Sequence, residues 1–261
     1  MSLTDGLHAH LVPFALVTAR LGGLFMFAPL LSGPAVPVKV RAMLAVMASL
    51  AVYPGLMADG LAQSQPLSLF GVAPFLAAEA LIGAAIGLLA SIPLVAVQTG
   101  GHVMGYQMGL GIASVYNPEM DTQSDAVGEL VFYLAVAAFL SMGGMELLFS
   151  ALVGSFASLP PGAAVMQPGA LELATGLAAS GFDLALRVAA PVTGIIMLLM
   201  LAMGFIMKTM PQINVLSVGF AIKIIVGLIV LGLALRVLDT VVRDELTDGL
   251  GMVVRWVIGS E

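Results

Sequence analysis

The chain has 261 residues, of which 60% are hydrophobic and only 9% are charged. Soluble domains carry about 25% charged residues, so this composition excludes a protein dispersed in water and indicates an integral membrane protein. The lack of cysteine excludes disulfides and thiolate metal sites, three scattered histidines do not predict a metal centre, and the net charge of −6 argues against nucleic-acid binding. We therefore expect no cofactor.

Six apolar segments follow one another, and each approaches or exceeds the ~20 residues that cross a bilayer as a helix. We expect the first to be retained rather than cleaved as a signal peptide, because the preceding residues lack a basic side chain. Lipid offers no partner to a free backbone amide, so we predict an all-α fold of about six membrane helices, arranged as kinked hairpins with a central plug-like loop. The segments run roughly over 11–31, 36–57, 70–97, 127–159, 178–206 and 213–238.

Helix-breaking residues separate these segments, because proline lacks an amide proton and glycine is permissive in turns. Pro93 and Pro191 instead fall inside apolar runs, where we expect them to kink a helix. Basic residues are too sparse for the positive-inside rule to fix the topology. The breaks are Ser32-Gly33-Pro34 with Pro37, Pro54-Gly55 with the stretch from Asp59 to Pro66, Pro160-Pro161-Gly162, and Pro211.

Three glycines stand four residues apart in the middle of the chain, at Gly101, Gly105 and Gly109. On a helix they would form one smooth face that another backbone can approach closely. Plain helix packing explains such a face as well as a specialised function does.

A polar, acidic loop follows. Asn117-Pro118 predicts a turn, and Glu119, Asp121 and Asp125 come directly after it. The loop is either an ordinary solvated connector or a movable segment that lines or blocks a water-filled path, since irregular backbone at membrane depth is tolerated only there or within protein.

Charged residues in or at the ends of the apolar segments, Glu79 among them, are costly unless they are paired or wet. Asp183 and Arg187 are four residues apart and are expected to form a local ion pair on one helical face. Further along, Lys208 and Lys223 flank Pro211, and amide side chains follow this proline at Gln212 and Asn214. We interpret these five residues as a structural joint that serves assembly.

Four stretches in order carry a resemblance to a known family. The most specific is PQINVLSVGFAIK, from Pro211 to Lys223, and the others are Val40–Pro54, Gly105–Pro118 and Phe139–Pro160. Together they resemble the FliR family of flagellar biosynthetic proteins and its counterparts in type III secretion systems. The chain departs from the family pattern at Lys208, where the family usually has arginine, at Met145, which often is histidine, and at Asn117, which commonly is aspartate.

The resemblance implies a core component, not an enzyme, of the flagellar-type (type III) export gate in the bacterial inner membrane, within the flagellar basal body. The implied partners are the P and Q membrane components, the switch-type B component and the unfolded exported proteins. Residues 1–175 would be a P-like part and residues 176–261 a Q-like hairpin with a C-terminal tail. The central loop, about 107–125, would plug the pore through Met108, Ile112, Val115, Tyr116, Asn117, Pro118 and Met120.

The main alternative is a secondary transporter of a small solute, which also uses helices broken by glycine and proline. No convincing inverted repeat relates the two halves of the chain. An intramembrane serine protease is disfavoured, because His102 is the one histidine away from the N-terminus and no G-x-S-x-G motif occurs.

Overall fold

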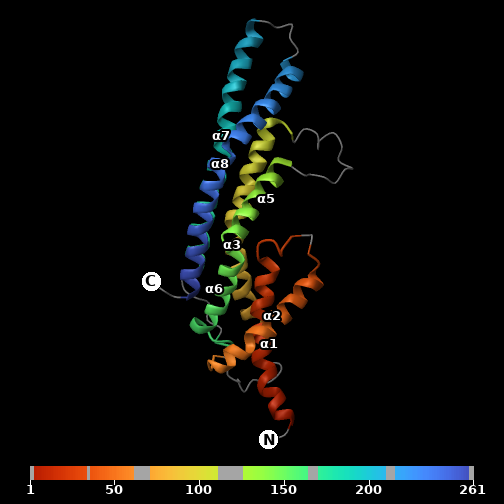
Figure 1. Ribbon diagram of the computed structural model, residues 1–261, viewed down its shortest axis with the longest axis vertical. Helices are drawn as coiled ribbons and strands as arrows, with labels where there is room; N and C mark the ends of the chain where they lie inside the picture. The colour runs from red at the N-terminus through yellow and green to blue at the C-terminus, as the bar shows by residue number, and fades with distance from the viewer. Residues whose placement is uncertain are drawn as a thin grey trace. The chain divides into compact units, whose positions relative to one another are not determined.

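The computed structural model describes residues 3–33, 36–61, 71–110, 126–163, 170–209 and 215–258. Every regular element within these ranges is an α-helix (Figure 1), as the sequence predicts. Five of these helices are long and apolar enough to cross a membrane, or up to six spans if α5 and α6 are counted as one. The helices are α1 (Leu3–Phe27), α2 (Val38–Ala58), α3 (Ala73–Met108), α5 (Ala126–Ser141), α6 (Gly144–Ser158), α7 (Ala170–Thr209) and α8 (Val215–Ile258).

The helices exceed the apolar segments at several ends. Pro54 lies inside α2, which ends at Ala58, so Pro54-Gly55 does not end this helix, whereas Asp59, the first residue of the other predicted stop, caps it. A proline near the end of a helix removes only one hydrogen bond, and the remaining amides still continue the ladder. Likewise, α3 reaches Met108 and α8 reaches Ile258, because backbone hydrogen bonding does not stop where hydropathy falls.

The fourth apolar segment is two helices rather than one. The interruption falls at Met142 and Gly143, and Gly143 has a φ of 72°, in the left-handed region. Its carbonyl accepts a hydrogen bond from the amide of Leu147 at 3.0 Å and so begins α6. Glycine takes this backbone conformation without the steric cost that a Cβ imposes.

The chain forms two compact units, and three long helices contribute to both. Unit 1 comprises Met1–Ile92, Met142–Leu177 and Asp248–Glu261, whereas unit 2 comprises Pro93–Ser141 and Ala178–Thr247. This division follows packing, so the proposed P-like and Q-like parts of the chain stay a prediction.

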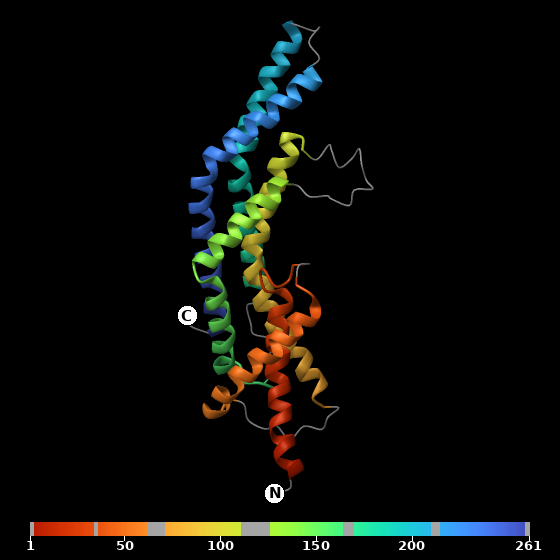
Figure 2. The same ribbon diagram turned by 45° about the vertical axis from the view of Figure 1, so that its right-hand side comes forward.

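In unit 1, α1 lies beside α2 and the first half of α3 (Figures 1 and 2). The backbones of α1 and α3 touch at glycines: a Cβ built on Gly83 would collide with the Arg20 carbonyl, and one on Gly23 would collide with the Ala80 carbonyl. A Cβ on Gly87 would lie 2.9 Å from the Leu24 carbonyl oxygen. Small residues permit this close approach between membrane helices.

In unit 2, the second half of α3 lies beside α5 in both views (Figures 1 and 2). The ends of α7 and α8 that flank residues 210–214 also lie side by side. The core is apolar and includes Leu94, Val97, Met104, Phe139, Val188, Val192, Ile196 and Leu231.

Candidate functional site

A buried ion pair joins two helices of unit 1. The Nε atom of Arg20, on α1, donates to Oε2 of Glu79, on α3, at 2.5 Å. The two side chains are 0% and 1% exposed. An unpaired charge at such a site costs several kcal/mol, so each residue depends on the other.

A hydroxyl on α6 and a carbonyl directly after α6 accept the remaining hydrogen bonds of the guanidinium. Arg20 Nη1 donates to the hydroxyl of Ser155, on α6, and Nη2 donates to the carbonyl of Leu159, each at 2.9 Å. The guanidinium carbon also lies 4.3 Å from the ring centroid of Phe156, a distance at which the ring face attracts a cation. The planar, five-donor fork of arginine suits this set of partners, and lysine would not reproduce it.

Both carboxylate oxygens of Glu79 accept hydrogen bonds. Its second oxygen, Oε1, accepts a hydrogen bond from the amide of Gly162 at 2.9 Å, in the turn after α6. The cluster of Arg20, Glu79, Ser155, Leu159 and Gly162 therefore fastens α1, α3 and the end of α6 together without leaving net charge. We call it the Arg20 cluster. Its donors and acceptors are used internally, so its chemistry is that of a structural fastener.

Sequence reasoning flagged Glu79 as a costly charge but did not pair it with Arg20. The available signal was one charge of each sign, Arg20 in the first apolar segment and Glu79 in the third. The pairing requires α1 and α3 to touch, and the glycines that allow this, Gly83 and Gly87, are also four residues apart.

Unit 2 carries its ion pairs on single helices. The predicted pair of Asp183 and Arg187 is confirmed, with 2.5 Å between Oδ2 and Nη2 and with the side chains 53% and 60% exposed. A second pair, between Asp239 and Arg243 on α8, was not predicted, and its Nε–Oδ2 distance is 2.9 Å. Arg243 Nη1 also donates to the hydroxyl of Ser141.

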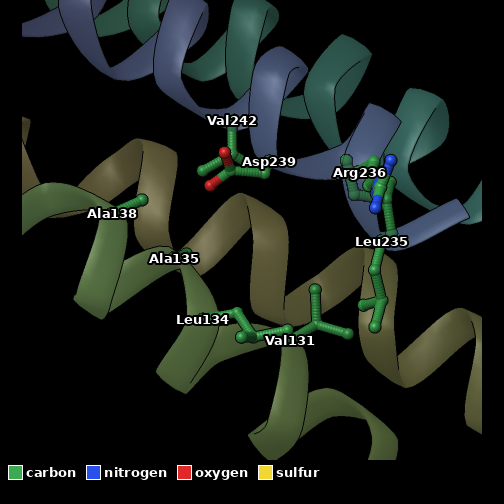
Figure 3. Close-up of a pocket in the computed structure, with 9 residues that line it drawn as sticks. Val131, Leu134, Ala135, Ala138, Leu235, Arg236, Asp239 and Val242 are labelled. Carbon is green, nitrogen blue, oxygen red and sulfur yellow. The ribbon is translucent and has the colours of Figure 1, made fainter. Parts of the chain in front are cut away.

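A groove of about 490 Å³ runs between α5 and α8 in unit 2. Figure 3 shows apolar side chains of α5, including Val131 and Leu134, facing Leu235 and Val242 of α8. Arg236 and Asp239 supply its polar atoms. Within the described ranges, no group of three or more histidine or carboxylate side chains is placed to hold a metal ion.

The central glycines occupy different positions. A Cβ on Gly101 would lie 2.6 Å from the Cα atom of Gly128, so α3 and α5 touch there, and Gly105 is buried. Gly109 lies one residue beyond α3, with a φ of 86°, rather than on the helical face. The amide of Gly109 bonds the Tyr106 carbonyl and that of Leu110 bonds the Gly105 carbonyl, both at 3.0 Å. This is the Schellman pattern that ends a helix with glycine.

The remaining predicted site residues are only partly described. Met108 is completely buried, and its side chain contacts Gly227 on α8. Lys208 is exposed at the end of α7, and Lys223 is half-buried on α8. Outside the described residues lie Ile112, Val115, Tyr116, Asn117, Pro118, Met120, Pro211, Gln212 and Asn214.

Comparison with known proteins decides the family. The family model "Bacterial export proteins, family 1" matches residues 11–249. The chain belongs to this family, the FliR family. It is 30% identical over 209 residues to the flagellar biosynthetic protein FliR of Escherichia coli K12, with 80% of this chain and 78% of that one covered.

Other FliR family members match to similar degrees. Identity to FliR of Bacillus subtilis strain 168 is 34% over 169 residues, or 64% of this chain and 65% of that protein. Identity to the Yop proteins translocation protein T of Yersinia pestis is 26% over 229 residues, or 85% of each chain. The resemblance seen in the four sequence stretches is thus confirmed over most of the chain, and the membrane helices suit a multi-pass member of this family.

Proposed function

We propose that this chain is the R component of a flagellar-type protein-export gate, and that it forms the membrane pore with P and Q components. The observation that carries the proposal is the family match over residues 11–249. The family model describes bacterial export proteins, and the named relatives include flagellar biosynthetic proteins and a protein named for the translocation of Yop proteins. The proposed location is the bacterial inner membrane, in the flagellar basal body.

The exposed apolar surface of unit 2 supports a role within an assembly. The second half of α7 exposes one large apolar side chain after another, among them Met197 at 67%, Leu201 at 57% and Phe205 at 74%. On α8, Leu233 is 77% exposed. Lipid covers such a surface in part, and membrane helices of partner proteins pack on it without a loss of apolar contact.

The central loop, about 107–125, is proposed as the plug of this pore. Its supporting features are the glycine stop at Gly109 and the turn residues and carboxylates that follow in the sequence. A sealed pore that passes chains of any sequence needs a segment that can be displaced, and methionine suits its lining because the thioether is adaptable. The export substrates would be unfolded proteins.

Co-expression with candidate P and Q components tests the assembly. After mild detergent extraction, the proposal predicts that this chain is recovered in a complex with both small partners and poorly without them. Recovery of a stable monomer or symmetric dimer that binds neither partner would contradict the export-gate assignment and favour a secondary transporter. The switch-type B component is expected to join the assembled complex.

A second experiment tests the plug separately. Replacing residues 117–124 by a short Gly-Ser linker should leave the complex assembled while cells become permeable to ions. The matched control replaces residues 62–69, another inter-helix segment, by the same linker. Normal assembly without added leakage would make the central loop a connector while leaving the gate assignment intact.

A further inference from the structure

An apolar groove lies in unit 1 between α1, α2 and the start of α3, and nothing in the proposed function assigns it. It measures about 610 Å³ and is lined by small or apolar residues such as Gly22, Phe27, Val38, Ala77 and Ala80. A Cβ on Gly22 would meet nothing within 4 Å, so the groove is open along α1. Its size is that of a small-molecule site rather than a packing defect.

One charged side chain, Arg41 on α2, is among the described residues that line the groove. Its Nε atom donates to the Val36 carbonyl at 3.1 Å, and Nη2 donates to the Gly33 carbonyl at 2.5 Å. These two carbonyls orient the guanidinium but do not neutralise it. Among the described carboxylates, none forms an ion pair with Arg41.

The charge stands at one end of the groove. Both α1 and α2 contain candidate membrane spans, which are joined through residues 28–37. Phe27 is the last residue of the first span, and Arg41 lies in the first turn of the second. From Ala19 to Phe27 the groove follows nine residues of α1, or about 12 Å for eight steps of 1.5 Å each. One leaflet of the hydrocarbon core is about 15 Å thick.

We propose that this groove binds an anionic phospholipid, with the phosphate at Arg41 and one acyl chain along α1 and α3. The groove has the features that a lipid in one leaflet requires. Its apolar part is about one leaflet deep, and the guanidinium of Arg41 at its end forms an ion pair with none of the described carboxylates. Lys39, exposed on the first turn of α2, adds positive charge at the same end. Arginine is the side chain best suited to a phosphate, because its planar fork donates two hydrogen bonds.

A partner helix could also cover the apolar body, but it would leave the Arg41 charge without a counterion unless it brought a carboxylate to that spot. A phospholipid supplies both parts at once, and basic residues near a membrane surface favour anionic lipids. The inference depends on the membrane-protein class and not on the export-gate assignment.

Photo-crosslinking lipids test the proposal on the intact chain, in whatever complex it is recovered. The chain is reconstituted in mixed phosphatidylglycerol and phosphatidylcholine vesicles, in which one lipid at a time carries a photoreactive acyl chain. Trypsin then releases residues 21–39, which contain the α1 wall of the groove, and residues 188–208, which carry exposed apolar side chains of α7. The second peptide is the internal control for non-selective lipid contact.

We expect the ratio of phosphatidylglycerol to phosphatidylcholine labelling to be about fivefold higher in residues 21–39 than in residues 188–208, which corresponds to about 1 kcal/mol. Arg41→Gln should abolish this preference, whereas Arg236→Gln, which removes an exposed cation of unit 2, should leave it unchanged. Ala77→Leu should fill the groove and lower labelling of residues 21–39 by both lipids.

Equal ratios in the two peptides would overturn the proposal, because the charge would then recognise no headgroup. If neither lipid labels residues 21–39, the proposal is also overturned, because protein would then cover the groove. If Arg41→Gln is not recovered, Ala77→Leu still decides, since it retains the arginine and removes only the space for the acyl chain.

Discussion

The two units handle charge in opposite ways. In unit 1, Arg20 and Glu79 are 59 residues apart in the sequence, come from two different helices and are buried. In unit 2, Asp183 with Arg187 and Asp239 with Arg243 each pair within one turn of a single helix, at half-exposed positions. The number of ion pairs is therefore a poor guide to what holds this protein together.

The difference lies in what replaces water. Ser155, Leu159, Gly162 and the Phe156 ring supply the Arg20 cluster with a full set of partners, so breaking it leaves a buried charge. The pairs of unit 2 keep access to their surroundings, and either member alone can reorient. We infer that the Arg20 cluster holds α1, α3 and the end of α6 in a fixed arrangement within unit 1, whereas the described ion pairs of unit 2 join no two helices.

Removing one member of the buried pair should have the largest effect. Glu79→Gln keeps the size of the side chain but leaves the Arg20 guanidinium without a counterion, and we expect a loss of about 3–5 kcal/mol in stability. The measurement is recovery from the membrane and the thermal unfolding midpoint in detergent. The double variant Arg20→Met, Glu79→Gln removes the stranded charge and should recover part of the loss, whereas parental behaviour of Glu79→Gln would mean that the cluster stabilises nothing.

The backbone contact between α1 and α3 should come next. Gly83→Ala places a methyl group against the Arg20 carbonyl, so α1 and α3 must separate and the Arg20 cluster loosens with them. We expect a loss of about 1–3 kcal/mol, as for other overpacked sites.

Gly22→Ala is the matched control for this variant, because nothing lies within 4 Å of the added methyl group. It should be neutral or slightly stabilising, since alanine favours a helix more than glycine does. Equal unfolding midpoints for the two variants would argue that α1 and α3 do not touch in solution.

Hydropathy predicted the helical class and the order of the segments, because a bilayer demands long apolar helices wherever it is crossed. Hydropathy did not predict the helix break at Gly143 or the helix end at Gly109, because the sequence does not show whether a glycine has a negative or a positive φ. The local pair of Asp183 and Arg187 was predictable from helical spacing alone. The Arg20 cluster was not, because it depends on which helices become neighbours.

Substitution of Gly109, which ends α3, should lower the stability by an intermediate amount. Gly109→Ala forces a Cβ into the left-handed region and toward the Phe220 ring, 2.7 Å from its Cε2 atom. The backbone conformation alone costs about 1–2 kcal/mol. Gly60→Ala carries the same kind of strain, with a φ of 70°, but meets open space. The excess loss of unfolding midpoint in Gly109→Ala over Gly60→Ala measures the Phe220 contact, and no excess would show that the ring moves freely.

The smallest effect should come from the exposed pair on α7. Asp183→Asn removes the charge partner of Arg187 with little change in size, and pairs four residues apart on a helix contribute about 0.3–0.5 kcal/mol when exposed. The Arg187 side chain is 60% exposed and long enough to direct its guanidinium toward water or lipid headgroups after the partner is lost. We therefore expect a barely shifted unfolding midpoint in detergent, and Asp239→Asn on α8 should behave alike. A loss as large as that of Glu79→Gln would contradict the contrast between the units, because it would place the Asp183–Arg187 pair in surroundings as dry as those of the Arg20 cluster.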